Sequence, residues 1–309
     1  MALANRISQT AQSTILLAVP DKLEEAVLDR IAAVAQTLSA ELHIFFPIVI
    51  PPVPLTSMAS EMPPLVDDHR MATARTRRLA ADTLRALRSL EMRATAQVGV
   101  CASVNEGVLN AASRLQPDLL MVPRSDNAGI FDRPFVPDCE EIATHDVATW
   151  VISRSRVASE SILGLLEPGS RNDTDNERVA RETARLARSL NAQAHLLCCD
   201  SKRESLELAE AAIAQQITKV AEHEESETVR EIYELASRHQ IPNTRIHIDN
   251  ANEADVIERI LEPLGVGLVV ACSRSRSILG GLFKREKIPD VPNAACDLLV
   301  LGEADVPHS

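Results

Sequence analysis

Two stretches, VLDRIAAVAQTLSAELHI at residues 27–44 and VARETARLARSLNAQAHL at residues 179–196, align without a gap. Apolar residues recur in each at spacings of three and four, which is the period of an amphipathic helix. Each helix feeds directly into an apolar run that is typical of a strand. His43 and His195 occupy equivalent positions near the starts of these runs. A helix-and-strand unit therefore occurs twice in the chain.

The segments around this unit recur in the same order. Runs of strand-forming residues precede the two helices, at residues 13–21 and 161–169. Short apolar strands end the two repeats, at residues 148–153 and 296–302. A further segment in each repeat predicts a helix followed by a strand, and it begins with Asn105 or Asn252, each expected to be a helix N-cap. The chain therefore predicts two domains, residues 1–155 and 156–309, joined near SRSRVASE.

The predicted strands are apolar throughout rather than alternating, which indicates a sheet that is covered on both faces. Right-handed β-α-β crossovers would then build a doubly wound parallel sheet in each half. We therefore expect an α/β fold made of two tandem doubly wound parallel-sheet domains. Ligands of such sheets bind beyond the carboxyl ends of the strands, so the candidate site lies there.

Composition narrows the functional classes. The chain has 309 residues, 45% of them apolar, and a net charge of −12, so it lacks the basic surface expected of a nucleic-acid-binding protein. Its apolar runs are too short or too broken by proline to cross a bilayer, and no signal peptide is evident. We expect a cytoplasmic protein with no nucleic-acid partner and no membrane insertion.

The order and duplication of these segments, with the strings AQTLSAELHIFFPI, DLLMV and CDLLVL, resemble the universal stress protein family in its tandem two-domain, UspE-like form. The resemblance covers residues 13–153 and 161–302. It implies an adenine nucleotide α-hydrolase-like fold, a stress-response role, and ATP binding in some members. It also implies pairing through the final strand, either between the two domains of one chain or in a homodimer.

ATP-binding members of that family carry an Asp after the first strand and a glycine loop after the fourth. In the second half Glu167 stands at the Asp position, whereas Cys272 and Ser275 stand where loop glycines would be. Glycine lets backbone N–H groups approach phosphates, so the loop CSRSRSILGGLFKRE is a degenerate form of the motif. The candidate nucleotide or anion site consists of Glu167, Ser273, Arg276, Gly280, Gly281 and Lys284. The alternative is a solvated basic loop that caps the sheet.

The first half departs further from the family pattern. Pro20 takes the Asp position, with Asp21 one place later, and the loop at residues 123–138 has one glycine and three acidic residues that would repel phosphate. Weak ATP or anion binding is therefore expected only in the second half, and no other cofactor is expected.

The other candidate residues and clusters indicate structural roles rather than catalysis or metal binding. The six cysteines lack CxxC spacing and are expected to be buried thiols, and Trp150 on a closing strand is expected to pack in the core or at a domain interface. His223 and its neighbouring glutamates have helical spacing for a metal, but a solvated charged face is the commoner arrangement. No Walker A loop, HExxH pair or nucleophile elbow occurs, so neither catalytic nor metal-binding residues are predicted.

The sequence therefore predicts a non-catalytic stress-response protein that regulates or senses a ligand. One alternative is a carrier of an apolar or anionic small molecule between the two halves. Another is an ATP-dependent enzyme of the nucleotide α-hydrolase-like group, which should show an intact phosphate loop.

Overall fold

A computed structural model of the chain describes the following residues: 13–50, 65–124, 137–143, 145, 147–153, 160–167, 173–199, 229–249, 253–273 and 296–302. The chain packs as two compact units, Met1–Arg156 with Gly302–Ser309 and Val157–Leu301. The domain bounds taken from the sequence remain a prediction.

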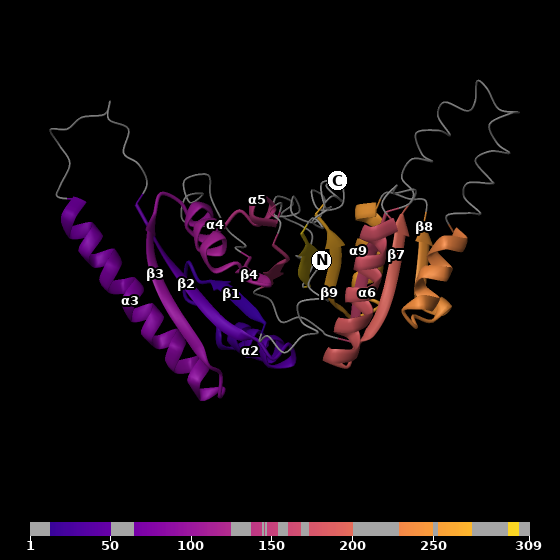
Figure 1. The fold of residues 1–309 in the computed structure, drawn as a ribbon, viewed down its shortest axis with the longest axis horizontal. Coiled ribbons are helices and arrows are strands. Elements are labelled where there is room, and N and C mark those ends of the chain that lie inside the picture. Colours follow the sequence, from indigo (N-terminus) through magenta and orange to yellow (C-terminus); the bar gives the residue numbers. More distant parts are fainter. Residues whose placement is uncertain are drawn as a thin grey trace, which may run out of the picture. The chain divides into compact units, whose positions relative to one another are not determined.

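The first unit alternates strands and helices. Its elements are β1 (Thr14–Ala18), α2 (Glu25–Thr37), β2 (Glu41–Val49), α3 (Leu65–Ser89), β3 (Ala94–Cys101), α4 (Val104–Leu115), β4 (Leu119–Pro123), α5 (Cys139–Ala143) and β5 (Thr149–Ile152). The strands are all parallel to their neighbours, in the order β3-β2-β1-β4-β5. Figure 1 shows α3 running along β3 at the outer side of this unit.

The second unit repeats this plan within the described residues. Its elements are β6 (Ser161–Leu166), α6 (Asp173–Leu190), β7 (Gln193–Cys199), a helical segment at residues 229–238, η2 (Asn243–Arg245), β8 (Ile246–Asp249), α9 (Glu253–Leu261), β9 (Val266–Cys272) and β10 (Asp297–Leu301). The strand order is β10-β9-β6-β7-β8, again parallel. The predicted α/β fold class with parallel sheets is confirmed.

The central strands are buried along their whole length. All residues of β4, β5, β6, β9 and β10 are buried. The continuous apolar runs seen in the sequence are therefore explained by sheets that are covered on both faces. The six cysteines are all buried and free, and Trp150 is buried, as the sequence predicted.

The helix ends show the repeat in backbone detail. Positive φ angles occur at equivalent helix ends of the two units, in the pairs Ser39 and Asn191, Glu91 and Gln240, and Gln116 and Gly265. A left-handed residue at this position lets the chain reverse while the last carbonyls of the helix stay bonded. Ala40 N–H donates to the Ala35 carbonyl, and Ala192 N–H donates to the Ala187 carbonyl in the same way.

The predicted N-cap Asn105 is corrected by the structure. Ser103 caps α4, because its Oγ accepts from the Glu106 N–H at 3.2 Å and the Glu106 carboxylate accepts from the Ala102 N–H at 2.9 Å. This is a variant of the capping box in which the carboxylate bonds to the N–H of the residue before the cap, and its S-x-x-E spacing is present in the sequence. Asn105 lies in the first turn instead, where its Oδ1 accepts from the Asp138 N–H at 2.8 Å. Its counterpart Asn252 lies outside the described residues.

Candidate functional site

The candidate site lies at the carboxyl ends of β6 and β9 in the second unit. These two strands are neighbours, with Gly164 opposite Val270, and continuing their register by three residues places Glu167 beside Ser273. From β6 the sheet continues to β7 on one side, and from β9 it continues to β10 on the other. This is the switch point of a doubly wound sheet, where such folds bind ligands.

Ser273 brings an unsatisfied hydroxyl to this point. Its N–H donates to the Leu301 carbonyl at 2.9 Å, which fixes the backbone at the end of β9. The side chain is buried, and its Oγ has no hydrogen-bond partner among the described residues. Leaving a buried hydroxyl unpaired costs about 1–3 kcal/mol, so the atom is suited to a ligand or a water at the site.

Asn176 on α6 forms hydrogen bonds with the backbone of Glu167 at the site. Its Oδ1 accepts from the Glu167 N–H at 3.0 Å, and its Nδ2 donates to the Glu167 carbonyl at 2.9 Å. Both backbone groups of Glu167 are thereby satisfied, while its side chain stays half-buried. Asn176 is not among the predicted site residues, and the only signal for it in the sequence is a polar amide near the start of the helix that follows β6.

The structure thus brings together two of the predicted site residues, Glu167 and Ser273. The other four, Arg276, Gly280, Gly281 and Lys284, lie outside the described residues. The residues of the His223 cluster do so as well.

The first unit has the same backbone arrangement with different side chains. Arg124 N–H donates to the Ile152 carbonyl at 2.8 Å, as Ser273 does to Leu301. Continuing the β1–β4 register from Leu17 and Met121 places Pro20 beside Arg124, where the second unit has Glu167 and Ser273. Asp21 is exposed, and its carboxylate accepts from the Lys22 N–H at 2.7 Å and lies 4.0 Å from the Arg75 guanidinium. Neither Pro20 nor Arg124, which stand at the positions of Glu167 and Ser273, is fully buried.

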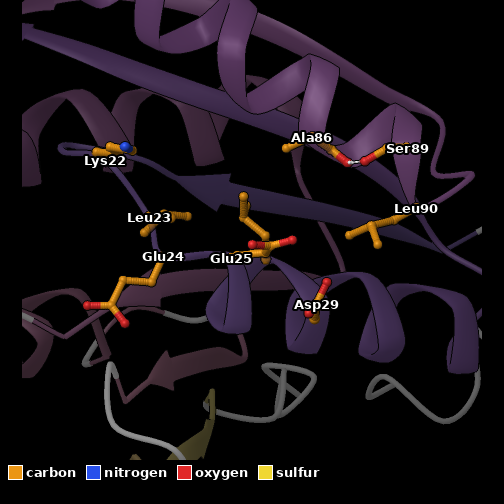
Figure 2. Close-up of a pocket in the computed structure, with 9 residues that line it drawn as sticks. Lys22, Leu23, Glu24, Glu25, Asp29, Ala86, Ser89 and Leu90 are labelled. Carbon is orange, nitrogen blue, oxygen red and sulfur yellow. Dashed lines mark hydrogen bonds between the residues drawn. The ribbon is translucent and has the colours of Figure 1, made fainter.

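A separate groove of about 580 Å³ lies in the first unit, between α2 and the end of α3. Its lining residues are Lys22, Leu23, Glu24, Glu25, Leu28, Asp29, Ala86, Ser89 and Leu90 (Figure 2). Leu23 and Leu28 are buried, whereas Glu24, Glu25 and Asp29 are exposed along the rim. Three carboxylates around one groove disfavour a phosphate ligand, so this groove is not the predicted anion site.

The repeated histidines each contact a side chain that lies 52 residues later in the chain. His43 Nδ1 is 2.8 Å from Thr95 Oγ1, and His195 Nδ1 is 3.1 Å from His247 Nε2. The rings of His195 and His247 are stacked, with centroids 5.4 Å apart. The described residues contain no group of three or more His, Cys, Asp or Glu side chains suited to a metal. We therefore interpret this pair as a packing contact of β7 and β8.

The buried thiol of Cys101 is equally unsuited to chemistry. Burial, followed by the charge of Glu106, raises the pKa of this thiol to about 11. The thiol stays protonated near neutral pH and is therefore a poor nucleophile.

We predict that the chain loses stability as the pH falls from 6.5 towards 4. Burial, followed by His247 and Arg245, lowers the pKa of His195 from 6.5 to about 4. In this window the unfolded chain binds a proton that the folded chain does not, so stability that is present above pH 6.5 is lost on acidification. His195→Gln should remove on the order of 2 kcal/mol of this pH dependence. Urea unfolding at pH 7 and pH 4.5 measures it, and equal losses in the variant and the wild type would refute the assignment.

These features define an α/β protein with a polar switch point in its second parallel sheet. Residues 170–301 match the Universal stress protein family, so this part of the chain is a domain of that family. No curated protein matches the sequence.

Solved structures share the fold over nearly the whole chain. A functionally unknown protein from Pseudomonas aeruginosa PAO1 is 14% identical, with a TM-score of 0.62 over 96% of this chain and 94% of that chain. A universal stress protein from Archaeoglobus fulgidus DSM 4304 is 11% identical, with a TM-score of 0.63 over 94% of this chain and 97% of that chain. At these identities the likeness shows the fold alone. No helix in the described part of the chain has the length and apolar character needed to span a membrane.

Proposed function

We propose that the chain is a non-catalytic, tandem UspE-like stress protein of the cytoplasm that regulates or senses through a weak nucleotide or anion site in its second domain. The observation that carries the proposal is the buried, unpartnered hydroxyl of Ser273 beside Glu167 at the switch point. A hydroxyl in this position can donate to a phosphate or carboxylate oxygen. Pairing of the domains through their final strands remains a prediction.

Two features of the site favour weak binding and no turnover. The amide of Asn176 already occupies the backbone N–H and carbonyl of Glu167, so these groups are not available to a ligand. The Glu167 carboxylate would also repel a phosphate that approached Ser273. The loop sequence supplies basic side chains but few glycines, and point charges without converging backbone N–H groups are screened at physiological salt.

We predict that ATP with magnesium binds the full chain more weakly than about 10 μM at physiological ionic strength, and that Ser273→Ala weakens this binding about 5-fold, the effect of roughly one hydrogen bond. Isothermal titration calorimetry over a salt series measures both effects. Arg276→Ala should weaken binding more than Arg124→Ala, because only the second domain carries the site. Micromolar or tighter affinity would contradict a degenerate phosphate loop, and steady phosphate release would indicate an ATP-dependent enzyme.

Thr183→Val supplies the matched control. Thr183 on α6 is also buried, and its hydroxyl also has no hydrogen-bond partner among the described residues. Both substitutions remove an unpaired hydroxyl and should not lower stability, but only Ser273→Ala should weaken ligand binding. If the two variants bind ATP equally well, Ser273 is only a packing residue and the proposal fails. An apolar molecule that copurifies with the chain in native mass spectrometry would favour the carrier alternative.

A further inference from the structure

We propose that the outer edge of β3 is a docking surface for an extended acidic peptide segment of another protein, which adds to the first sheet as a further strand. β3 is the last strand in the order of its unit. It pairs with β2 in an unbroken register from Leu42 opposite Ala94 to Val49 opposite Cys101. Within the described residues no strand pairs with its other edge. Such an edge is a ready template for strand addition.

The backbone groups that face outward can be assigned. The Cys101 carbonyl accepts from the Ile50 N–H at 2.9 Å, so the polar groups of Cys101 point towards β2. Because these groups alternate along a strand, those of Ala96, Val98 and Val100 point to the free edge. An added strand could pair with all three of these residues.

This edge lacks the features that normally prevent pairing. β3 reads ATAQVGVC, with no charged residue and no proline, and its register with β2 has no bulge. The outer strand of the second unit differs, because β8 has only four residues and Asp249 at its end forms an ion pair with Arg259 at 2.6 Å. Short length and charge are the usual protection of an edge, and only β8 has them.

Exposed apolar side chains gather at the same place. Val100 is 62% exposed and Val98 is 36% exposed, although both lie on a strand. Ile50, whose N–H bonds to the Cys101 carbonyl, is 37% exposed. Three of the five exposed large apolar residues in the described part of the chain therefore lie on β3 or directly beside its end.

The positive charge on one side of α3 indicates that an acidic partner would bind at this edge. The buried side of this helix carries Ala80, Thr83 and Leu87, and the side next to α2 carries Ala86 and Ser89. Helical spacing places Arg70, Arg77 and Arg88 on the remaining side, next to the edge of β3. All three are exposed, and none forms an ion pair with a described residue.

These arginines disfavour a second copy of the chain as the occupant. Antiparallel pairing of two β3 strands about a twofold axis would bring the same basic sides of two α3 helices together. Like charges brought together in this way oppose assembly. Gly99 and Cys101 of β3 face Phe45 and α4, so Val98 and Val100 lie on the face of the sheet that carries α3. An added strand with carboxylates on that face is complementary in charge to these arginines.

A labelled ten-residue peptide that alternates Val and Glu tests the proposal by fluorescence anisotropy with the full chain. We expect saturable, salt-sensitive binding. Val98→Pro should weaken it at least 10-fold, because proline removes an outward N–H and leaves the β2 ladder intact. Val98→Thr keeps that N–H and should bind like the wild type. Arg77→Glu should weaken binding at least 3-fold, and so should replacing Glu by Lys in the peptide. Circular dichroism checks that each variant is folded.

Equal affinity of folded Val98→Pro and the wild type would overturn the proposal, as would equal binding of the Lys peptide. Analytical ultracentrifugation without peptide tests the other occupant. A wild-type dimer that Val98→Pro converts to a monomer would assign the edge to a second copy of this chain and would likewise overturn the proposal.

Discussion

Replacing Gly164 by Val is expected to lower the free energy of unfolding of the second unit by about 3 kcal/mol, the upper part of the range for overpacked cores. Gly164 lies within β6, where α6 and β7 approach it closely. A Cβ atom at this position would lie 2.5 Å from Thr183 Oγ1 and 2.9 Å from Leu196 Cδ2. Thr183 and Leu196 are both fully buried, so neither can move aside without disturbing the core.

A second substitution tests this cause. Gly164→Ala should destabilise less than Gly164→Val, and adding Thr183→Ala to it should recover part of the loss by removing the nearest side-chain atom. Urea unfolding of the full chain, followed by circular dichroism, measures all of these variants. Wild-type stability of Gly164→Val, or no recovery with Thr183→Ala, would contradict the close-packing argument.

The fold was predictable because it is encoded by periodicity. The helical spacing of apolar residues in 27–44 and 179–196, followed by continuous apolar runs, is enough to place strands and helices in a parallel α/β order. The strand ends were predictable for the same reason, because an apolar run stops where the strand stops. Glu167 and Ser273 could therefore be placed at one edge of the sheet before their neighbours were known.

The side-chain contacts of the site were not predictable in this way. Asn176 contacts Glu167, which lies nine residues earlier in the chain. The periodic pattern of apolar residues does not indicate which polar side chains will contact each other. The cap of α4 shows a different error. Asn105 was assigned by residue type alone, whereas the capping-box spacing of Ser103 and Glu106 in the sequence pointed to the correct residue.

The two repeats also differ in the contacts that their equivalent side chains make. His43 and His195 align, yet His43 bonds to a threonine directly opposite it, whereas His195 meets a second histidine that lies opposite Leu197. The contact with the edge strand therefore differs between the units in the partner residue and in its place in the pairing. A repeat in sequence fixes the order of elements, but edge-strand registers depend on packing that the pattern does not describe.

A buried ion pair on α6 gives the second large effect. Glu182 is 2% exposed, and its Oε2 accepts from Arg185 Nε at 2.7 Å. Arg181 is the other cation near it, with its Nε 3.9 Å from Oε1. Nothing in the sequence marks Glu182 as buried, because a charged residue within an amphipathic helix normally faces solvent.

Arg185→Ala is expected to lower the free energy of unfolding by about 3 kcal/mol, because it leaves the buried Glu182 carboxylate with only Arg181 beside it, whose Nε lies 3.9 Å away without a hydrogen bond to it. Arg85→Ala in α3 is the matched control. Arg85 and Asp82 have the same i, i+3 spacing and a 2.9 Å contact, but their side chains are 77% and 55% exposed. That loss should stay below about 1 kcal/mol.

Urea unfolding of both variants, with the wild type alongside, separates the two cases. The double variant Glu182→Leu with Arg185→Leu should recover most of the stability that Arg185→Ala loses, since replacing both members of a buried pair by apolar residues is often close to neutral. If Arg185→Ala and Arg85→Ala lose equally little stability, burial of the Glu182 carboxylate does not determine the strength of this pair. If the double variant is instead less stable than Arg185→Ala, the pair itself stabilises α6, and the loss cannot be assigned to an unpaired buried charge.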